Sequence, residues 1–322
     1  MRIAGLLLLA LLSFFSTDPL SSSGQEAEGV PWIPFEWVGD SIGDRYYDKL
    51  GIYVPFSIEG IPYQFKSQFD LGAVSTMVYG NTVAPYLAAY PEIAAKVDTV
   101  DRSYMIQGQR VGGIEGVTIK LGDVSFANRD LLLFENYGGT LPGDSITSSP
   151  IKIGTIAPDL FQDKLLLIDY PNQRLASVDS LPTSLHGKIS YVDFKLDQGR
   201  IKIPLTIDGE VHDFLFDTGA SMFHLHVTPK DWGNIGDTTA RVDTVETSTW
   251  GEYYDVYGLP IKAEVALGDF SLAGGQVFAN PREDFARFFE EEGILGVTGN
   301  VYFSDHMIVI DYKNQRFGVV SD

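Results

Sequence analysis

The chain contains the same pattern of residues twice, and this duplication restricts its possible folds more than any other feature. Val54–Gly60 (VPFSIEG) and Ile203–Gly209 (IPLTIDG) match position by position as apolar, Pro, apolar, hydroxyl, Ile, acid and Gly. Each is followed by a second shared block, Gln68–Ala73 (QFDLGA) in the first copy and Leu215–Ala220 (LFDTGA) in the second. Such self-similarity indicates that one structural unit occurs twice.

Two further blocks extend the repeat, in the same order, towards the end of the chain. Leu121–Asp123 (LGD) returns as Leu267–Asp269, and Leu167–Arg174 (LIDYPNQR) returns as Val309–Arg316 (VIDYKNQR). The chain is therefore predicted to consist of two homologous units. Their predicted bounds are 49–181 and 201–322, with a polar, turn-rich joint at 182–200 between them.

Most of the chain has the residue pattern of strands. Apolar and polar residues alternate in several segments, and turn signals such as Glu59-Gly60 and Asp208-Gly209 separate them. Helical patterns are short and few, at 84–97, interrupted by Pro91, and at 283–292. An all-β fold is therefore predicted. The clearest predicted strands are 53–58, 117–121, 201–207 and 307–310.

The N-terminus has the three-part layout of a secretory signal. Met1-Arg2 is positively charged, Ile3–Phe15 is an apolar run too short to span a bilayer comfortably, and small and polar residues follow. We expect residues 1–24 to be removed from an exported protein, periplasmic or secreted; the alternative is an uncleaved anchor. Residues 25–48 are expected to be a short, acidic N-terminal extension that packs against one of the units.

Charge and cysteine content exclude several kinds of partner and chemistry. The chain has 43 acidic and 23 basic residues, a net charge of −20, and no cysteine. Such a surface repels nucleic acid and anionic lipid. Without cysteine there are no disulfides, no thiol catalysis and no Cys-ligated metal. We expect no nucleic-acid partner and no stable membrane association after signal removal.

The second Asp-x-Gly-Ala block has the features of a catalytic acid. Apolar residues precede Asp217, so the acid ends a buried strand, where desolvation raises its pKa. Gly219 permits a tight turn, and the Thr218 hydroxyl can brace it. Asp70 occupies the equivalent position in the first unit. Two such acids held together share a proton, so that one activates a water while the other polarises a carbonyl.

In these features the chain resembles the retropepsin and pepsin-like aspartic peptidases, in their bacterial-type bilobed single-chain form. The resemblance covers nearly the whole chain after about Lys49. It includes the paired acidic loops, a Gly-rich hairpin at Gln107–Gly116 and the apolar-apolar-Gly element Ile294–Gly296, which Lys152–Gly154 matches less well. It implies a bilobed all-β fold of two β-barrel-like lobes with the active cleft between them. It implies an aspartic endopeptidase that acts as a monomer on peptides or proteins.

The resemblance also assigns roles to individual residues. In the family, a hairpin flap carrying an aromatic residue closes over the substrate. The catalytic pair is then Asp70 and Asp217, the active-site loops are supported by Gly72, Ala73, Thr218, Gly219 and Ala220, and the flap and cleft candidates are Tyr104, Ile106, Gly108 and Trp250.

Leu71 departs from the family pattern, which has Thr at this position. The two family Thr residues brace each other's backbone, so we expect Thr218 to lack its partner here. A lost buried hydrogen bond costs about 1–3 kcal/mol, which weakens a site without abolishing it. The alternative is a catalytically silent pseudoprotease that still binds peptides in its cleft.

The remaining acidic and imidazole motifs indicate other roles. His224-Leu225-His226 places two imidazoles on one strand face, a geometry that can hold zinc, but no third ligand is near in sequence. Asp169 and Asp311 recur within the IDYxNQR block and are interpreted as acids that brace turns. We therefore expect no metal and no cofactor.

Overall fold

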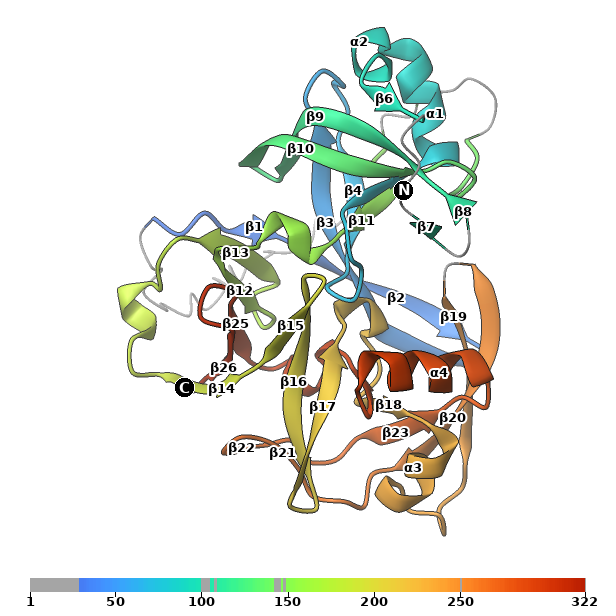
Figure 1. Ribbon diagram of the computed structural model, residues 1–322, viewed down its shortest axis with the longest axis vertical. Coiled ribbons are helices and arrows are strands. Elements are labelled where there is room, and N and C mark those ends of the chain that lie inside the picture. The colour runs from blue at the N-terminus through green and yellow to red at the C-terminus, as the bar shows by residue number, and fades with distance from the viewer. Residues whose placement is uncertain are drawn as a thin grey trace, which may run out of the picture.

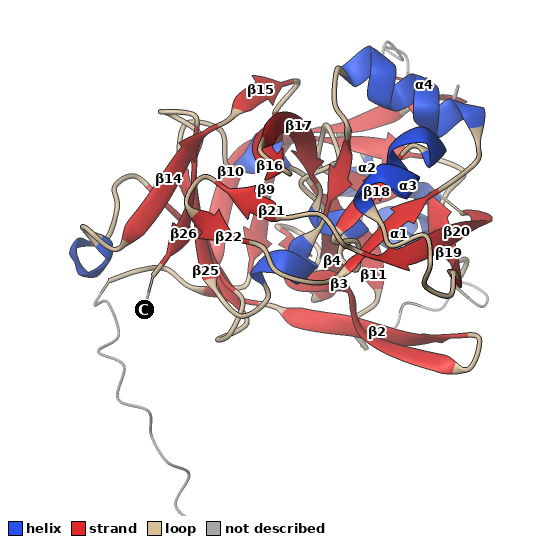
Figure 2. Cartoon of the chain, turned by 90° about the horizontal axis from the view of Figure 1, so that it is seen from below, coloured by secondary structure: helices blue, strands red, loops and turns tan. Residues whose placement is uncertain are grey.

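The computed structural model describes residues 29–99, 105–106, 109–141, 146, 149–249 and 251–321, which form a mostly β protein (Figures 1 and 2). Its strands form three large sheets and one two-stranded hairpin. This content agrees with the predicted all-β class, with a few short helices in addition. No helix in the described part of the chain is long and apolar enough to cross a membrane. The predicted signal lies outside the described residues.

The first large sheet has eight strands and is built from the first half of the chain; most of it lies in the upper part of Figure 1, and β2 extends downward beside β19. Helices α1 (Gly80–Ala89) and α2 (Pro91–Ala94) follow one of its central strands. In spatial order the strands are β2 (Glu36–Ile42), β3 (Arg45–Ile58), β4 (Phe65–Phe69), β11 (Lys152–Ile156), β5 (Met77–Tyr79), β10 (Val124–Phe134), β9 (Gly112–Leu121) and β6 (Val97–Asp98).

The second large sheet has ten strands and is built from the second half of the chain. Helices α3 (Pro229–Ile235) and α4 (Glu283–Glu292) pack beside it. In spatial order its strands are β19 (Asp243–Thr249), β20 (Glu252–Pro260), β23 (Gln276–Ala279), β18 (Leu225–Val227), β24 (Gly296–Thr298), β17 (Glu210–Phe216), β16 (Arg200–Ile207), β21 (Val265–Leu267) and β22 (Phe270–Ser271), with β15 (Lys195–Asp197) also paired to β16.

The centres of these two sheets follow one plan. In the first, β3–β4 is antiparallel, β4–β11 parallel, β11–β5 antiparallel and β5–β10 parallel. In the second, β16–β17, β17–β24, β24–β18 and β18–β23 repeat this sequence of directions. Consequently β4 and β17 occupy equivalent places, and Asp70 and Asp217 follow them directly.

A third sheet of six strands contains segments from both halves. Its central strands, β12 and β25, pair antiparallel with Leu167 opposite Val309. These two residues are also equivalent in the sequence repeat, so the approximate twofold axis that relates the halves passes through this pair. In spatial order the strands are β1 (Ile33–Pro34), β13 (Arg174–Val178), β12 (Leu165–Asp169), β25 (Met307–Asp311), β26 (Arg316–Val320) and β14 (Ile189–Asp193).

The repeated acids at the ends of β12 and β25 brace turns, as the sequence suggested. Asp169 accepts hydrogen bonds from the Asn172 backbone N–H, at 3.2 Å, and from Arg174 Nε, at 2.9 Å. Asp311 does the same with Asn314, at 3.0 Å, and with an Arg316 guanidinium nitrogen, at 2.8 Å. Both acids are therefore used in the fold.

Several segments differ from the sequence-based expectation. Residues 25–48 were expected to form an extension, but from Ile33 onward they supply β1, β2 and the start of β3. The turn-rich joint at 182–200 contains β14 and β15. β14 is mostly half-buried at the edge of its sheet, and β15 is more exposed. Helix α1 begins at Gly80, before the predicted 84, and Pro91 starts α2, because an N-terminal Pro needs no helical N–H partner.

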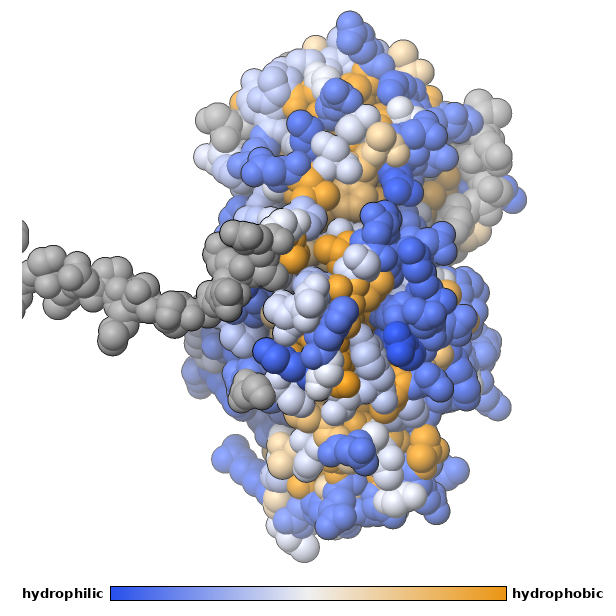
Figure 3. Space-filling model, turned by 90° about the vertical axis from the view of Figure 1, so that its left-hand side faces the viewer, coloured by the Kyte–Doolittle hydropathy of each residue, from blue (hydrophilic) through white to orange (hydrophobic). Residues whose placement is uncertain are grey.

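One hydrophobic cluster runs through the three large sheets and fixes the strands that precede both acids. Phe69 and Phe216 have no exposed surface, and Leu71 is equally buried in the same cluster. Burial of a large apolar side chain contributes roughly 1.5–3 kcal/mol, so the acidic loops begin from rigid positions. Outside this core, the face seen in Figure 3 mixes many hydrophilic residues with smaller apolar areas.

Candidate active site

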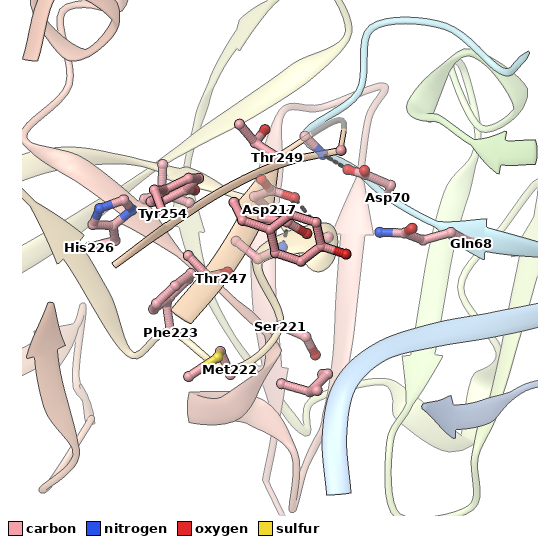
Figure 4. A pocket seen from close by; sticks show the side chains of 18 of the residues that line it. Gln68, Asp70, Asp217, Ser221, Met222, Phe223, His226, Thr247, Thr249 and Tyr254 are labelled. Atoms are coloured by element: carbon pink, nitrogen blue, oxygen red, sulfur yellow. Dashed lines mark hydrogen bonds between the residues drawn. The ribbon is translucent and has the colours of Figure 1, made fainter. Parts of the chain in front are cut away.

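The structure brings Asp70 and Asp217 together in the lining of one cleft (Figure 4). The two carboxyl groups are hydrogen-bonded to each other. Each also accepts hydrogen bonds from two backbone N–H groups of its own loop, so the arrangement is nearly symmetric. These bonds are Gly72 N at 3.0 Å and Ala73 N at 3.1 Å to Asp70 Oδ1, and Gly219 N at 2.7 Å and Ala220 N at 3.2 Å to Asp217 Oδ1.

The glycines of the two loops pack against the acid of the opposite half. A Cβ atom on Gly72 would lie 2.5 Å from Asp217 Oδ1, and one on Gly219 would lie 2.6 Å from Asp70 Oδ2. Neither position therefore has room for a side chain. The Gly of each Asp-x-Gly-Ala block is needed for this close approach of backbone to carboxyl group.

Burial raises the pKa of both acids above the ordinary value of an aspartate. The pKa of Asp70 is raised well above it, first by desolvation and then by the nearby charge of Asp217. Desolvation also raises the pKa of Asp217, but the hydrogen bonds from Asp70 and from its own loop oppose this. Two close carboxyl groups cannot both ionise easily, so the pair retains one proton, held mainly by Asp70.

The expectation that Thr218 lacks a partner is wrong. Its buried hydroxyl donates to the Phe69 carbonyl oxygen, at 3.0 Å, and accepts from the Leu71 backbone N–H, at 2.9 Å. Both partners are backbone groups, so the side chain at position 71 does not affect them. The apolar Leu71 side chain instead joins the core. Thr218 of the second loop therefore still braces the first loop by hydrogen bonds. In the reverse direction no hydroxyl is available, and the Leu71 side chain contributes apolar packing instead.

Further polar residues support the loops and were not identified from the sequence. Asn300 Nδ2 donates to the Thr218 carbonyl oxygen, at 3.0 Å, and to Ser221 Oγ, at 2.9 Å. The Tyr170 hydroxyl donates to Asn300 Oδ1, at 2.6 Å, across a separation of 130 residues. No local sequence pattern marks Asn300, because its partners come from distant parts of the chain.

The cleft has a volume of about 1180 Å³, enough for several side chains of an extended peptide. The eight-stranded and the ten-stranded sheet both contribute to its lining. The other walls include Asp40–Gly43 at the end of the β2–β3 hairpin, Thr247–Thr249 of the β19–β20 hairpin, and Phe285, Phe288 and Phe289 of α4.

Three of the four flap and cleft candidates, Tyr104, Gly108 and Trp250, lie outside the described residues. Ile106 is described, in the small β7–β8 hairpin (Met105–Ile106 and Gln109–Arg110), but it is absent from the described cleft lining. It packs instead in an apolar cluster with Tyr79, which does line the cleft.

The β19–β20 hairpin of the second half forms a wall of the cleft. Thr249 and Tyr254, on either side of its turn, belong to the cleft lining. Gly251 stands at the turn with a φ of +88°, and a Cβ there would lie 3.7 Å from the Tyr137 ring of the first half. This hairpin therefore extends from the second half to the first.

The β2–β3 hairpin extends in the opposite direction, from the first half of the chain to the second. Arg45 near its tip forms an ion pair with Asp243, at 3.2 Å, and Ile42 and Tyr47 pack against a second-half cluster that includes Phe223. The predicted extension is thus part of the cleft. Sequence reasoning missed this role, because the segment lies outside the repeat.

The two neighbouring histidines contact different residues. His224 packs against Tyr302, whereas His226 stacks on Phe223 and contacts Phe289. Burial lowers the pKa of each to about 4, so both imidazoles are neutral near neutral pH. Among the described residues, no group of three His, Asp or Glu side chains is arranged to hold a metal ion.

Compared with models of known protein families and with curated proteins, the chain gives no match. Its function is therefore inferred from the geometry of the site.

Proposed function

We propose that this protein is an aspartic endopeptidase with a bilobed retropepsin/pepsin-like fold. In this proposal the eight-stranded and ten-stranded sheets form the two lobes, and the six-stranded sheet joins them. The observation that supports it best is the interlocked pair of acids, each held by two N–H groups of its own loop, within a large cleft. We further propose that the protein is exported after removal of residues 1–24 and acts as a monomer.

The two acids have different tasks in the proposed reaction. Asp217 is the more easily ionised acid and takes a proton from a water molecule, whose oxygen attacks the peptide carbonyl carbon. Asp70 donates its proton to the carbonyl oxygen, which gives a neutral tetrahedral diol. Asp217 then passes its proton to the amide nitrogen, the C–N bond breaks, and a diol hydroxyl returns a proton to Asp70.

Cleavage of a mixture of denatured proteins, between about pH 3 and pH 8, tests the proposal. The wild type should cleave, pepstatin should inhibit it, and Asp217→Asn should abolish cleavage. Asp179→Asn is a matched control, because Asp179 forms an exposed ion pair with Lys164 and is absent from the cleft lining. Equal cleavage by wild type and Asp217→Asn would rule out the proposed dyad.

The second candidate is a peptide-binding protein without catalysis. The observation in its favour is Leu71, whose buried side chain cannot supply the missing half of the loop bracing. This candidate predicts that folded wild type binds peptides and cleaves none at any pH. If Leu71→Thr alone then produced cleavage, the position of the dyad would be the part that is impaired.

A further inference from the structure

The internal repeat reveals a difference between the two walls beside the dyad. Gln68 and Lys152 in the first half are equivalent to Leu215 and Ile294 in the second. Leu215 and Ile294 pack with Phe289 in an apolar cluster beside the cleft. In the first half, Lys152 Nζ instead donates a hydrogen bond to Gln68 Oε1, at 2.7 Å, and both residues line the cleft.

The Lys152 ammonium has few partners for a partly buried charged group. Its Nζ lies 5.5 Å from the ring centre of Tyr79 and 5.7 Å from that of Tyr53. No carboxylate among the described residues forms an ion pair with it, and Gln68 takes only one of its three N–H donors. Burial lowers the pKa of Lys152, and the charge of Asp70 opposes this shift. A partly buried cation with free donors favours an anionic partner.

The position of this pair places it next to the reacting bond. Gln68 precedes Asp70 by two residues along β4 and its continuation, so the two side chains share a face. Figure 4 shows Gln68 beside Asp70, and the aromatic residues Phe223 and Tyr254 on the other side of Asp217. A peptide held at the dyad would therefore have one side chain near Gln68 and another near the apolar wall.

We propose that Lys152 and Gln68 form a subsite for an acidic side chain of the substrate, adjacent to the scissile bond. The proposal rests on the proposed peptidase function. Lys152 supplies the charge, and the Gln68 amide N–H₂ can donate a second hydrogen bond to the same carboxylate. The equivalent subsite at Leu215 and Phe289 takes a bulky apolar side chain on the other side of the bond.

The remaining charges of the cleft limit the substrate to one acidic residue at this point. The other basic residue of the lining, Arg200, is already paired with Glu292. Asp40, Glu246 and Asp255 line other parts of the cleft and repel further carboxylates. Peptides with several acidic residues should therefore be poor substrates, and the preference should be confined to one position.

Cleavage-site mapping with a peptide library, followed by matched peptides, tests the subsite. Glu or Asp should be enriched at one fixed position beside the scissile bond. At about pH 6, where a glutamate is ionised, a Glu peptide should be cleaved with a kcat/KM about tenfold to a hundredfold above its Gln counterpart. Below about pH 4.3 the preference should disappear, because the substrate carboxylate is then protonated.

Variants separate this role from a general effect on the site. Lys152→Met should remove the Glu preference, and Lys152→Glu should shift it towards Lys peptides. Lys66→Met is the matched control, because Lys66 pairs with Glu36 on the surface beside β11 and is absent from the cleft lining. If Lys152→Met slowed Glu and Gln peptides equally, or only moved the pH profile, the subsite would be refuted.

The two proposals fail in different ways. If wild type cleaves peptides with equal kcat/KM for Glu and Gln, the acidic subsite is wrong and the peptidase stands. If folded wild type cleaves nothing, the peptidase is wrong, and fluorescence anisotropy with the same labelled peptides tests the subsite. Tighter binding of the Glu peptide than of the Gln peptide, with amidated C-termini to exclude the terminal carboxylate, supports it; equal binding overturns it.

Discussion

Removal of the Thr218 hydroxyl should reveal how strongly the two acidic loops hold each other. Thr218→Val keeps the shape of this fully buried side chain but leaves the Leu71 N–H and the Phe69 carbonyl oxygen without the hydroxyl. Each unsatisfied buried group costs about 1–3 kcal/mol, so the free energy of unfolding should fall by about 2–6 kcal/mol. Against a typical stability of about 5–15 kcal/mol, this is a large loss.

Urea unfolding followed by Trp fluorescence measures this change without assuming any catalytic activity. Thr218→Ser is the control, because it keeps the hydroxyl and loses only one methyl group, at a cost of about 1 kcal/mol. If Thr218→Val unfolded within about 0.5 kcal/mol of the wild type, the hydroxyl bridge would not hold the loops together. In an active enzyme, the same variant should also lose roughly a hundredfold in rate, because a shift of about 1 Å misplaces the dyad.

Three further predictions concern the same loops. Gly72→Ala should reduce cleavage by at least about a hundredfold, because the added Cβ would collide with Asp217. Gly139→Ala is the control: a Cβ there meets nothing within 4 Å, so kcat/KM should not change. Leu71→Thr should lower the melting temperature, because about 1–3 kcal/mol of apolar burial is lost. If the new hydroxyl braces the second loop, kcat per folded molecule should rise. A lower kcat would refute this bracing. Because the pKa of Asp70 is raised in the folded state, its protonation contributes stability that is fully present below the ordinary aspartate value of 3.8. This stability is lost as pH rises from 3.8 through the higher folded-state pKa. Asp70→Asn should therefore raise the melting temperature at neutral pH, with a gain that shrinks at acidic pH, and an equal or lower melting temperature at neutral pH would contradict the shift.

The strands that precede the two acids were accessible from sequence because their signals are local. Alternation of apolar residues predicted the cores of β3, β9, β16 and β25, and the Asp-x-Gly-Ala blocks marked where β4 and β17 end. The repeat further indicated which residues are equivalent. Helix α4 was also predicted within its observed bounds, since Phe285, Phe288 and Phe289 follow helical spacing and Gly293 ends it in a left-handed conformation.

Other parts of the site depend on contacts between distant residues and have no local signal. The β2–β3 hairpin reaches the second half through Arg45 and Asp243, although its sequence lies outside the repeat. Asn300 was missed for the same reason. The partners of Thr218 were misjudged because hydrogen bonds to backbone groups do not depend on the neighbouring side chain.

By itself, the sequence determined the two equivalent acidic loops, because strand alternation and tight turns involve residues only a few positions apart. The tertiary structure alone decided that each loop glycine packs against the acid of the other half. It also decided that Lys152 meets Gln68, 84 residues away, in the cleft, although the repeat pairs both with apolar residues. Such contacts form only when the packed sheets bring the two halves together, so they cannot be read from either segment alone.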